Sequence, residues 1–501
     1  MIRRLLAILL PLFLMVGTVQ SASGASVKKG SPCSKVGSVQ VSGKAKFKCT
    51  KTGNKLLWQP ISSTSATVNL KEFENKECSQ VGERVLGTSQ YLECRSIAGN
   101  RAKRFLLSDN KVLITQNLGV NNIDDCKLRD QNPPYTGLSV GFPLRENVPV
   151  SGKVKVALIP IDFADTVGDY SAVDAATPHM KKVDTWLKQF TNGRMSYDWQ
   201  VTPNWIRNPK KISDYGVANS THFGYFDDRP LVQDLLNAAD PVVDFTNVKI
   251  VLFLFPRTIS DLPIQVIGQN QKRFTTNEAT IGNYWGGGRF AYQRDYEKLL
   301  WAIWIHETMH MHGLPGHAPG NGWPLSITTN QYGVALAINT WESFLAGWLD
   351  EKSILCKKAS DVNDFSVTLT PLDRDQEGLK SVMIPLNDHE LLVVESRRGE
   401  AFSSEMNRGF YGITTYLVDT KKNNDRSQES SGKDDGNDPT YPKFAYYLKS
   451  SSGDHGGVQL VRGYLDRNIL AYEGEHFLYR GIKISLTKSG EHDTVQIQKV
   501  S

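Results

Sequence analysis

The chain has no long apolar run after its first 25 residues, and its net charge is small. Residues 250–255, for example, have only the length of a buried β-strand, so no membrane-spanning helix is predicted. The 58 basic and 52 acidic side chains give a formal charge of +6, of which Arg3 and Arg4 account for two. The remaining excess of +4 argues against a nucleic-acid or membrane partner.

Two stretches carry only part of a known ligand-binding pattern. The glycine-rich residues 281–288 lack the Lys-Ser/Thr ending of a phosphate-binding loop, so we predict an ordinary loop there. Residues 421–440 are dense in polar residues and favour a solvated loop. A Ca²⁺ site at Asp434, Asp435 and Asp438 is the alternative, although the spacing is not that of an EF-hand.

The N-terminus has the features of a secretory signal peptide. Arg3 and Arg4 precede an apolar run over residues 5–19, and small residues follow through Ala25. The run is short for a membrane span, and a small-residue cleavage region follows it. We therefore predict export, with cleavage near Ala25 and no transmembrane anchor.

Six cysteines fit an oxidising compartment, and four of them belong to a tandem repeat. The sequence Cys-Ser-Lys-Val-Gly at Cys33 recurs as Cys-Ser-Gln-Val-Gly at Cys78. Each copy has a second cysteine at the same offset, Cys49 and Cys94, after a short strand-like segment. We predict two small β modules, each closed by one disulfide, that either attach the protein to a cell wall, a glycan or a substrate or serve as a spacer or pro-segment. By elimination, Cys126 then pairs with Cys356.

Residues 301–317 contain the pattern H-E-x-x-H at His306, Glu307 and His310. On a helix, residues four apart lie one turn above each other, so the two imidazoles converge on one point. Two histidine nitrogens suit Zn²⁺, and the adjacent Glu307 can act as general base toward a water molecule. The apolar residues upstream and Gly313 with Pro315 downstream predict a buried helix that ends at the glycine.

A catalytic zinc takes a third protein ligand, for which the sequence leaves several candidates. In the metzincin pattern H-E-x-x-H-x-x-G-x-x-H, the glycine turns the chain so that a third histidine reaches the metal. Gly313 is in register, but Gly316 occupies the ligand position and His317 comes one residue later. We favour His317. His312 would point to another face of the helix, and Glu342 is the carboxylate alternative.

Strands and helices alternate ahead of this helix. The patterns predict strands at residues 154–163, 196–201 and 248–255, and helices at 180–190 and 231–239. Such alternation is typical of an α/β domain whose zinc helix packs on a sheet. A further helix with an apolar stripe is predicted at residues 334–348.

Seven short motifs follow one another between Val154 and Thr420. They are residues 156–163 with Asp165, 190–196, 237–240, 306–315, 347–349, 392–397 and 412–420. In these motifs and their order the chain resembles the immune inhibitor A family of secreted bacterial zinc metallopeptidases. That family continues Gly-Leu-Pro with Asp, where this chain has Gly316 and His317, and the two cysteine repeats lie outside the resemblance.

The resemblance implies a zincin-like α+β catalytic domain with a mixed sheet, and a metalloendopeptidase that acts on proteins or peptides. It assigns His306 and His310 to zinc and Glu307 to the role of base, as the spacing does. Glu307 would take a proton from water and pass it to the leaving amine. Tyr332 and Tyr284 are candidate donors to the oxyanion.

The C-terminal part changes to a strand pattern. Predicted strands lie at residues 365–369, 381–384, 390–395, 412–418, 481–486 and 494–500, which indicates a β-sandwich-like domain. The predicted organisation is a signal peptide at 1–25, cysteine modules at 26–61 and 68–110, a linker at 111–150, a catalytic domain at 151–355 and a β-rich domain at 356–501. The alternative to a peptidase is a non-catalytic exported binding protein that keeps the zincin scaffold.

Overall fold

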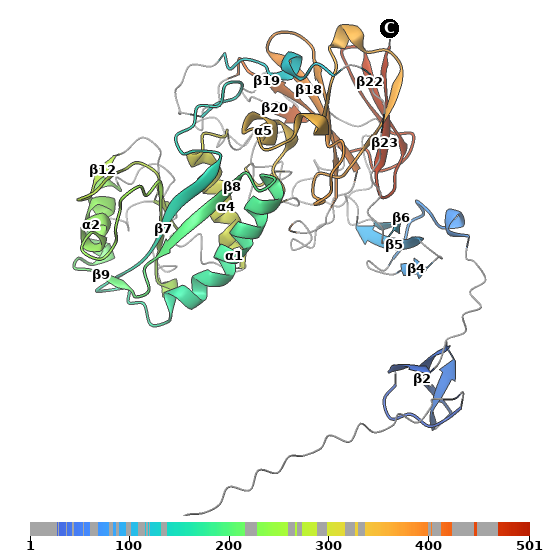
Figure 1. The fold of residues 1–501 in the computed structure, drawn as a ribbon, viewed down its shortest axis with the longest axis horizontal. Coiled ribbons are helices and arrows are strands. Elements are labelled where there is room, and N and C mark those ends of the chain that lie inside the picture. Colours follow the sequence, from blue (N-terminus) through green and yellow to red (C-terminus); the bar gives the residue numbers. More distant parts are fainter. Residues whose placement is uncertain are drawn as a thin grey trace, which may run out of the picture. The chain divides into compact units, whose positions relative to one another are not determined.

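The structure is a computed structural model in which the chain divides into two units, Met1–Val68 and Asn69–Ser501 (Figure 1). The residues that it describes are 28, 30–36, 38–42, 45–53, 55–60, 69–79, 84–86, 90–96, 102–108, 116, 119, 121–131, 138–215, 228–258, 266–267, 273–287, 298–315, 326–328, 336–398, 402, 412–422, 445–447 and 469–500. The predicted signal peptide and the candidate Ca²⁺ residues Asp434, Asp435 and Asp438 lie outside them.

The first unit contains the first cysteine repeat as a three-stranded antiparallel sheet. Its strands, in the order β1-β2-β3, are β1 (Val39–Ser42), β2 (Ala45–Thr52) and β3 (Lys55–Pro60). A disulfide joins Cys33, ahead of β1, to Cys49 in β2. Phe47 and Trp58 pack around it and form the small core of the module.

The second repeat has the same construction. Its antiparallel strands are β4 (Arg84–Leu86), β5 (Gln90–Ser96) and β6 (Ala102–Ser108), preceded by the 3-10 helix η1 (Leu70–Glu72). The disulfide Cys78–Cys94 closes this module. The prediction of two disulfide-closed β modules is therefore confirmed.

A six-stranded sheet forms the centre of the region after residue 150. Its strands are β7 (Gly152–Phe163), β8 (Met195–Val201), β9 (Ile206–Asn208), β10 (Ile250–Leu254), β11 (Val266–Ile267) and β14 (Tyr284–Gly287). The order is β11-β14-β10-β7-β8, with β9 beside the far end of β7. All pairs are parallel except β11 with β14, so the sheet is mixed, as predicted. A separate hairpin consists of β12 (Phe274–Thr275) and β13 (Thr280–Ile281). The loop predicted at residues 281–288 is wrong for β14, which pairs with β10 as a strand of the main sheet.

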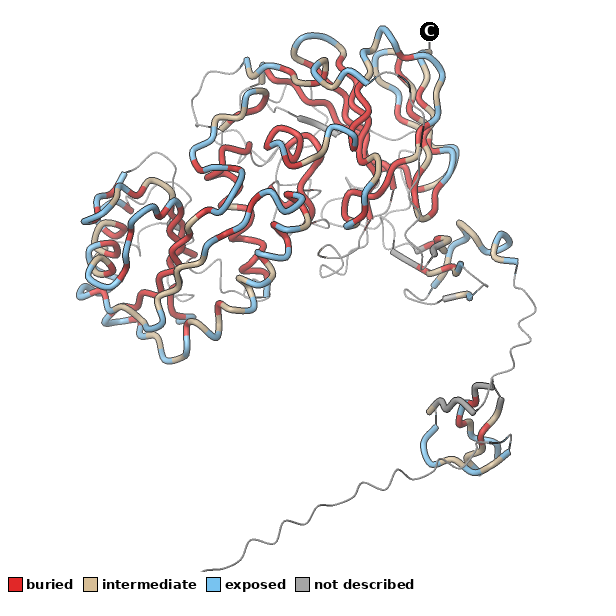
Figure 2. Tube along the Cα trace, viewed as in Figure 1, coloured by how far each residue is buried: buried red, intermediate tan, exposed pale blue. Residues whose placement is uncertain are grey.

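Helices cover both faces of this sheet. Successive side chains of a strand point to opposite faces, so neighbouring residues of β7 pack against different helices. On one face Val156 and Leu158 of β7 pack with α1 (Ala172–Phe190) and α4 (Leu300–Met311). On the other face Ala157 and Ile159 pack with α2 (Arg229–Ala239). Figure 1 shows α1 and α4 together with β8, and Figure 2 shows the buried strands between the helices.

Two predicted helices have different bounds. α1 begins at Ala172 rather than at residue 180, because the Ser171 side chain accepts a hydrogen bond from the Asp174 N–H and caps an earlier turn. The helix predicted at residues 334–348 is wrong in extent. The observed α5 spans only Thr340–Leu345, because Asn339 caps its start and Gly347, at φ +69°, follows its end.

The C-terminal part consists of two sheets that share one core, which confirms a β-rich region. The first sheet runs β15 (Ile354–Cys356), β17 (Ser381–Pro385), β18 (Glu390–Arg397), β19 (Gly412–Asp419) and β20 (Ala445–Tyr447). The second runs β16 (Phe365–Leu369), β23 (Asp493–Lys499), β22 (Ile482–Lys488) and β21 (His476–Tyr479). Side chains such as Val394 and Ile484 meet between them. Short 3-10 helices are η2 (Ile123–Cys126), η3 (Ile212–Tyr215), η7 (Glu351–Ser353) and η8 (Ala359–Asp361).

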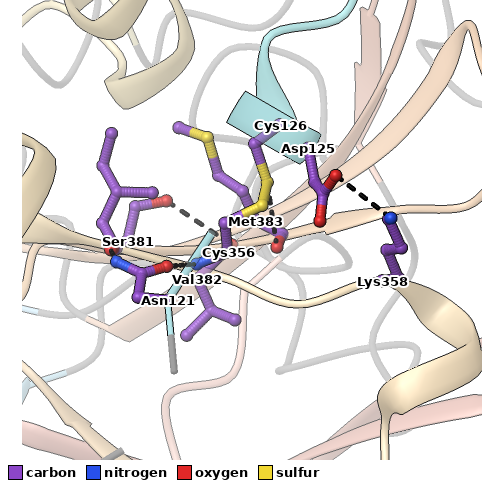
Figure 3. The surroundings of a disulfide bond; sticks show 9 residues. Asn121, Asp125, Cys126, Cys356, Lys358, Ser381, Val382 and Met383 are labelled. Atoms are coloured by element: carbon purple, nitrogen blue, oxygen red, sulfur yellow. Dashed lines mark hydrogen bonds and ion pairs between the residues drawn. A yellow bond between two sulfur atoms is a disulfide. The ribbon is translucent and has the colours of Figure 1, made fainter. Parts of the chain in front are cut away.

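The third disulfide joins Cys126 of η2 to Cys356 of β15, as predicted by elimination (Figure 3). The Asn121 side chain accepts a hydrogen bond of 2.8 Å from the Cys356 N–H, and Asp125 lies 3.1 Å from the Lys358 ammonium. Residues 121–131, which fall inside the predicted linker, therefore pack against the C-terminal sheet. Three disulfides fit an oxidising compartment. Within the described part of the chain, no helix combines the length and apolar character needed to span a membrane.

Candidate metal centre

Helix α4 carries the H-E-x-x-H pattern through the interior of the molecule. Of its twelve residues only Glu307 is more than slightly exposed. Trp301, Ile303 and Trp304 pack in the core that α4 shares with α1 and the sheet. A helix that is apolar on all sides is stable only when it is surrounded by other elements. The histidines on α4 are therefore held on a rigid, fully packed support.

His306 and His310 face each other at the end of this helix. Their Nε2 atoms lie 3.2 Å apart, their ring planes are nearly perpendicular at 84°, and the two residues are 2% and 3% exposed. Each ring is oriented by a backbone carbonyl, because the His306 Nδ1 lies 2.7 Å from the Ile327 oxygen and the His310 Nδ1 lies 3.3 Å from the Leu314 oxygen.

These two carbonyl contacts determine which nitrogen of each ring carries the proton. A carbonyl oxygen only accepts hydrogen bonds, so each Nδ1 carries the proton and donates it. In neutral imidazoles both Nε2 atoms then present lone pairs, and two lone pairs 3.2 Å apart repel each other unless a proton or a cation lies between them. Two nitrogen ligands of a tetrahedral zinc ion are separated by about 3.3 Å. The pair therefore fits a shared metal ion, with the carbonyl partners that metal-binding histidines usually have.

The turn after α4 places the second of these carbonyls. Gly313 has φ +93°, in the left-handed region, and its N–H donates to the His310 oxygen at 3.0 Å. The Leu314 N–H donates to the Met309 oxygen at 3.1 Å, which directs the chain back along the helix end. The Leu314 oxygen consequently reaches the His310 ring.

Glu307 lies on the one solvent-accessible side of α4. It is half-buried, whereas its neighbours His306 and Thr308 are buried. Its place next to His306 in the helix is the one that a general base of an H-E-x-x-H site occupies. A water molecule can therefore approach Glu307 without crossing the packed core.

His312 has a structural environment. It is fully buried, its Nδ1 lies 3.2 Å from the Val148 oxygen, and its Nε2 lies 3.1 Å from the Tyr197 hydroxyl. Burial lowers the pKa of His312 to about 4 and also raises that of the Tyr197 hydroxyl. Both ring nitrogens of His312 are thus engaged away from the His306–His310 pair, in agreement with the prediction that it points to another face.

A short hydrogen-bonded segment connects His306 to Glu342. Ile327, whose oxygen orients His306, is followed by Thr328, and the Thr328 hydroxyl donates to Oε2 of Glu342. Glu342 is fully buried, and its Oε1 has no hydrogen-bond partner among the described residues. Burial raises the pKa of Glu342 to about 8, which the hydrogen bonds from Thr328 and Asn339 partly oppose.

Helix α5, which carries Glu342, is fixed by β18. The carboxylate of Glu395 in β18 accepts hydrogen bonds from the N–H and the hydroxyl of Thr340, at 3.0 and 2.7 Å. The Nε of Arg397 donates to the same carboxylate at 2.8 Å. A buried carboxylate at a helix start is favourable because it satisfies backbone N–H groups there. The β-rich part thus positions the helix beside the candidate centre.

Of the remaining predicted site residues the structure describes only Tyr284, which does not join the histidine pair. Tyr284 lies in β14 with its ring in the core on the opposite face of the sheet from α4, and its hydroxyl donates to Asp228 at 3.0 Å. His317 and Tyr332 lie outside the described residues. Among the residues that the structure describes, no three His, Cys, Asp or Glu side chains gather into a metal site.

No protein-family model matches the chain, and no curated protein matches it either. The geometry around His306 and His310 is therefore what supports the candidate site.

Sequence patterns could indicate His306, Glu307 and His310 because their spacing is local. They did not reveal Thr328, Asn339 or Glu395, which act through contacts between distant segments. The only local signal among these was the sequence Asn339-Thr-Trp-Glu342, in which a side chain can cap a helix that carries an acidic residue three positions later.

Proposed function

We propose that the chain is a secreted zinc-dependent endopeptidase that resembles the immune inhibitor A family. The observation that carries this proposal is the pair of Nε2 atoms 3.2 Å apart, on rings whose Nδ1 atoms are bonded to the carbonyls of Ile327 and Leu314. Carbonyl acceptors on both Nδ1 atoms direct the two Nε2 lone pairs toward the same point, as a shared metal ion requires.

His306 and His310 would hold the metal through their Nε2 atoms, while the two carbonyls keep the rings in place. When bound, zinc would act as a Lewis acid, which polarises a peptide carbonyl and makes water more acidic. The buried Trp and Ile residues of α4 exclude bulk water from the far side of the pair. A substrate therefore approaches from the side of Glu307.

Glu307 is the general base of the proposed reaction. Its carboxylate accepts a proton from the water molecule that attacks the peptide carbonyl. The same carboxyl group then donates that proton to the nitrogen of the leaving amine, so Glu307 ends the cycle ionised again. Its partial exposure allows water to reach it.

Two residues compete for the role of third ligand. His317 follows the glycine turn that already brings the Leu314 oxygen back to His310. Glu342 is supported by its burial and by the carboxyl oxygen that lacks a partner among the described residues. We retain His317 as the proposed ligand and Glu342 as its alternative.

The test compares zinc content and casein hydrolysis for the wild type, Glu307→Gln and Glu377→Gln. Glu377→Gln is the matched control, because Glu377 is an exposed glutamate elsewhere on the surface. We expect about one zinc per chain in all three proteins. Glu307→Gln should lose a factor of 10² or more in turnover, since it keeps the size of the side chain but removes the base. Equal activity of Glu307→Gln and the wild type would contradict the mechanism.

His317→Ala and Glu342→Gln identify the third ligand. The true ligand variant should lose zinc, and the other should keep it. A wild-type protein that binds zinc but leaves casein and gelatin intact would favour the alternative, a binding protein that retains the metal site. A wild-type protein without zinc affinity would refute both proposals.

A further inference from the structure

The positive charge of the protein is concentrated in its first cysteine module. Residues 26–68 contain eight lysines and neither an acidic residue nor an arginine. Residues 69–501 contain 48 basic and 52 acidic side chains, so this larger part of the chain has a net charge of −4. The small net positive charge of the whole chain is thus the sum of a strongly basic unit and a weakly acidic one.

The lysines of this module lie on its surface. All five whose side chains the structure describes are exposed, namely Lys28, Lys35, Lys48, Lys51 and Lys55. They come from the segment ahead of β1, from β2 and from the start of β3. In β2, Lys48 alternates with Phe47 and Cys49, which point into the core. With no carboxylate in the module, none of these charges is neutralised within it.

The second module has the same construction but differs from the first in its charge and in its contacts with the rest of the chain. Residues 69–108 contain seven basic and five acidic side chains. Its third strand docks on the C-terminal sheets, where Lys103 is fully buried and its ammonium donates to Ser489 at 3.1 Å and to the Ala471 oxygen. Phe105 packs against Tyr472. The second copy has thus become part of the larger unit, whereas the first forms a unit of its own.

We propose that the first cysteine module binds an anionic polysaccharide. Lysine ammonium groups are point charges on flexible side chains, and they suit a flexible polymer that carries single negative charges spaced along its length. The module lacks arginine, which recognises phosphate and bases with two parallel hydrogen bonds. Its only aromatic residues, Phe47 and Trp58, are buried, so bases have no exposed ring to stack on. These features favour an acidic polysaccharide over a nucleic acid, and the proposal does not depend on peptidase activity.

Binding of this kind releases counterions and is therefore sensitive to salt. On a flexible polyanion each neutralised charge contributes about 0.7 to the slope of log K against log salt concentration. If four lysines are engaged, the Kd should rise roughly 50-fold between 50 and 200 mM NaCl. A neutral polysaccharide releases no counterions.

The experiment measures binding of the full-length mature chain to polygalacturonate, neutral dextran and a single-stranded 20-mer DNA at matched charge concentration. One variant replaces the five exposed lysines of the module with glutamine. The control variant replaces five exposed lysines of the larger unit, Lys181, Lys188, Lys211, Lys249 and Lys488. Titration of free thiols verifies that the disulfide Cys33–Cys49 is closed in every protein.

We expect the wild type and the control variant to bind polygalacturonate with the steep salt dependence described above and not to bind dextran. The module variant should bind at least ten times more weakly and with a flatter slope. Undiminished binding by the module variant, absence of wild-type binding at 50 mM NaCl, or equal binding to dextran would overturn the proposal. Tighter binding to the DNA than to polygalacturonate would replace the polysaccharide with a nucleic acid.

Discussion

At the scale of single residues, Gly313 controls the geometry of His310. Its left-handed backbone, φ +93°, returns the Leu314 oxygen to the ring, and a Cβ at this position would collide with the Arg145 carbonyl oxygen. Gly193 also has a positive φ of +69°, but a Cβ there would meet no atom within 4 Å. Alanine substitutions at these two glycines therefore distinguish the cost of backbone strain from the cost of a steric collision.

Gly313→Ala should cost more stability than Gly193→Ala. Left-handed strain alone costs about 1–2 kcal/mol, which is the expected loss for Gly193→Ala. Gly313→Ala adds a collision with backbone that cannot move aside, for a total on the order of 3 kcal/mol or more. Chemical denaturation of the two variants measures the difference, and zinc affinity should fall only in Gly313→Ala. Equal losses of stability would mean that the Arg145 segment adjusts freely.

The residues that could be predicted at this scale are those whose geometry depends on the helix alone. The i, i+4 spacing was sufficient to bring His306 and His310 together, because both lie on one helix. The orientation of the His306 ring depends on the oxygen of Ile327, twenty-one positions away. No periodicity in the sequence reports such a contact. Tyr284 illustrates the same limit, since its sheet face follows from the register of β14 with β10.

At the scale of elements, helix type was easier to predict than helix bounds. The apolar stripe through residues 334–348 predicts a long helix, but side chains buried in an extended segment and in a helix can give the same pattern in the sequence. Ala337 accepts a hydrogen bond from the Ile327 N–H, so the chain is not yet helical there. The cap at Asn339 and the carboxylate of Glu395 then set the start of the helix.

Strand β6 shows how an element can tie a module to a distant part of the chain. Phe105 is 1% exposed and packs against Tyr91 of its own module and Tyr472. The guanidinium of Arg398 lies 5.4 Å from the centre of the Phe105 ring, and the Lys103 ammonium lies 4.7 Å from it. Burial lowers the pKa of Lys103 to about 8, which the nearby carboxylate of Asp493 partly offsets.

Phe105→Ala should therefore loosen the second module from the C-terminal sheets. Removing a fully buried phenylalanine costs about 3–5 kcal/mol, and here it also removes the aromatic surface under two cations. Leu86→Ala is the matched control, because Leu86 lies in β4 of the same module and is 66% exposed. Limited proteolysis should cut the Phe105→Ala protein faster than the wild type and leave the control unchanged. Equal resistance of all three proteins would show that the docking does not depend on this ring.

At the scale of the whole molecule, the domain boundaries predicted from sequence separate parts that the structure joins. The second cysteine module and residues 121–131 both pack against the C-terminal region, and Asn69–Ser501 forms one unit. Composition suggested a linker because prolines and polar residues break the hydrophobic pattern there. A disulfide between residues 230 positions apart, Cys126 and Cys356, fastens this segment.

The three disulfides should accordingly differ in what they stabilise. Removing a cross-link restores chain entropy to the unfolded state, by about 5 kcal/mol for a loop of 230 residues and about 3 kcal/mol for one of 16. Cys126→Ala/Cys356→Ala should lower the main transition temperature on the order of 5–10 °C. Cys33→Ala/Cys49→Ala should leave that transition in place, because its loop lies in the separate first unit. Scanning calorimetry distinguishes the two, and equal shifts would mean that the units unfold together.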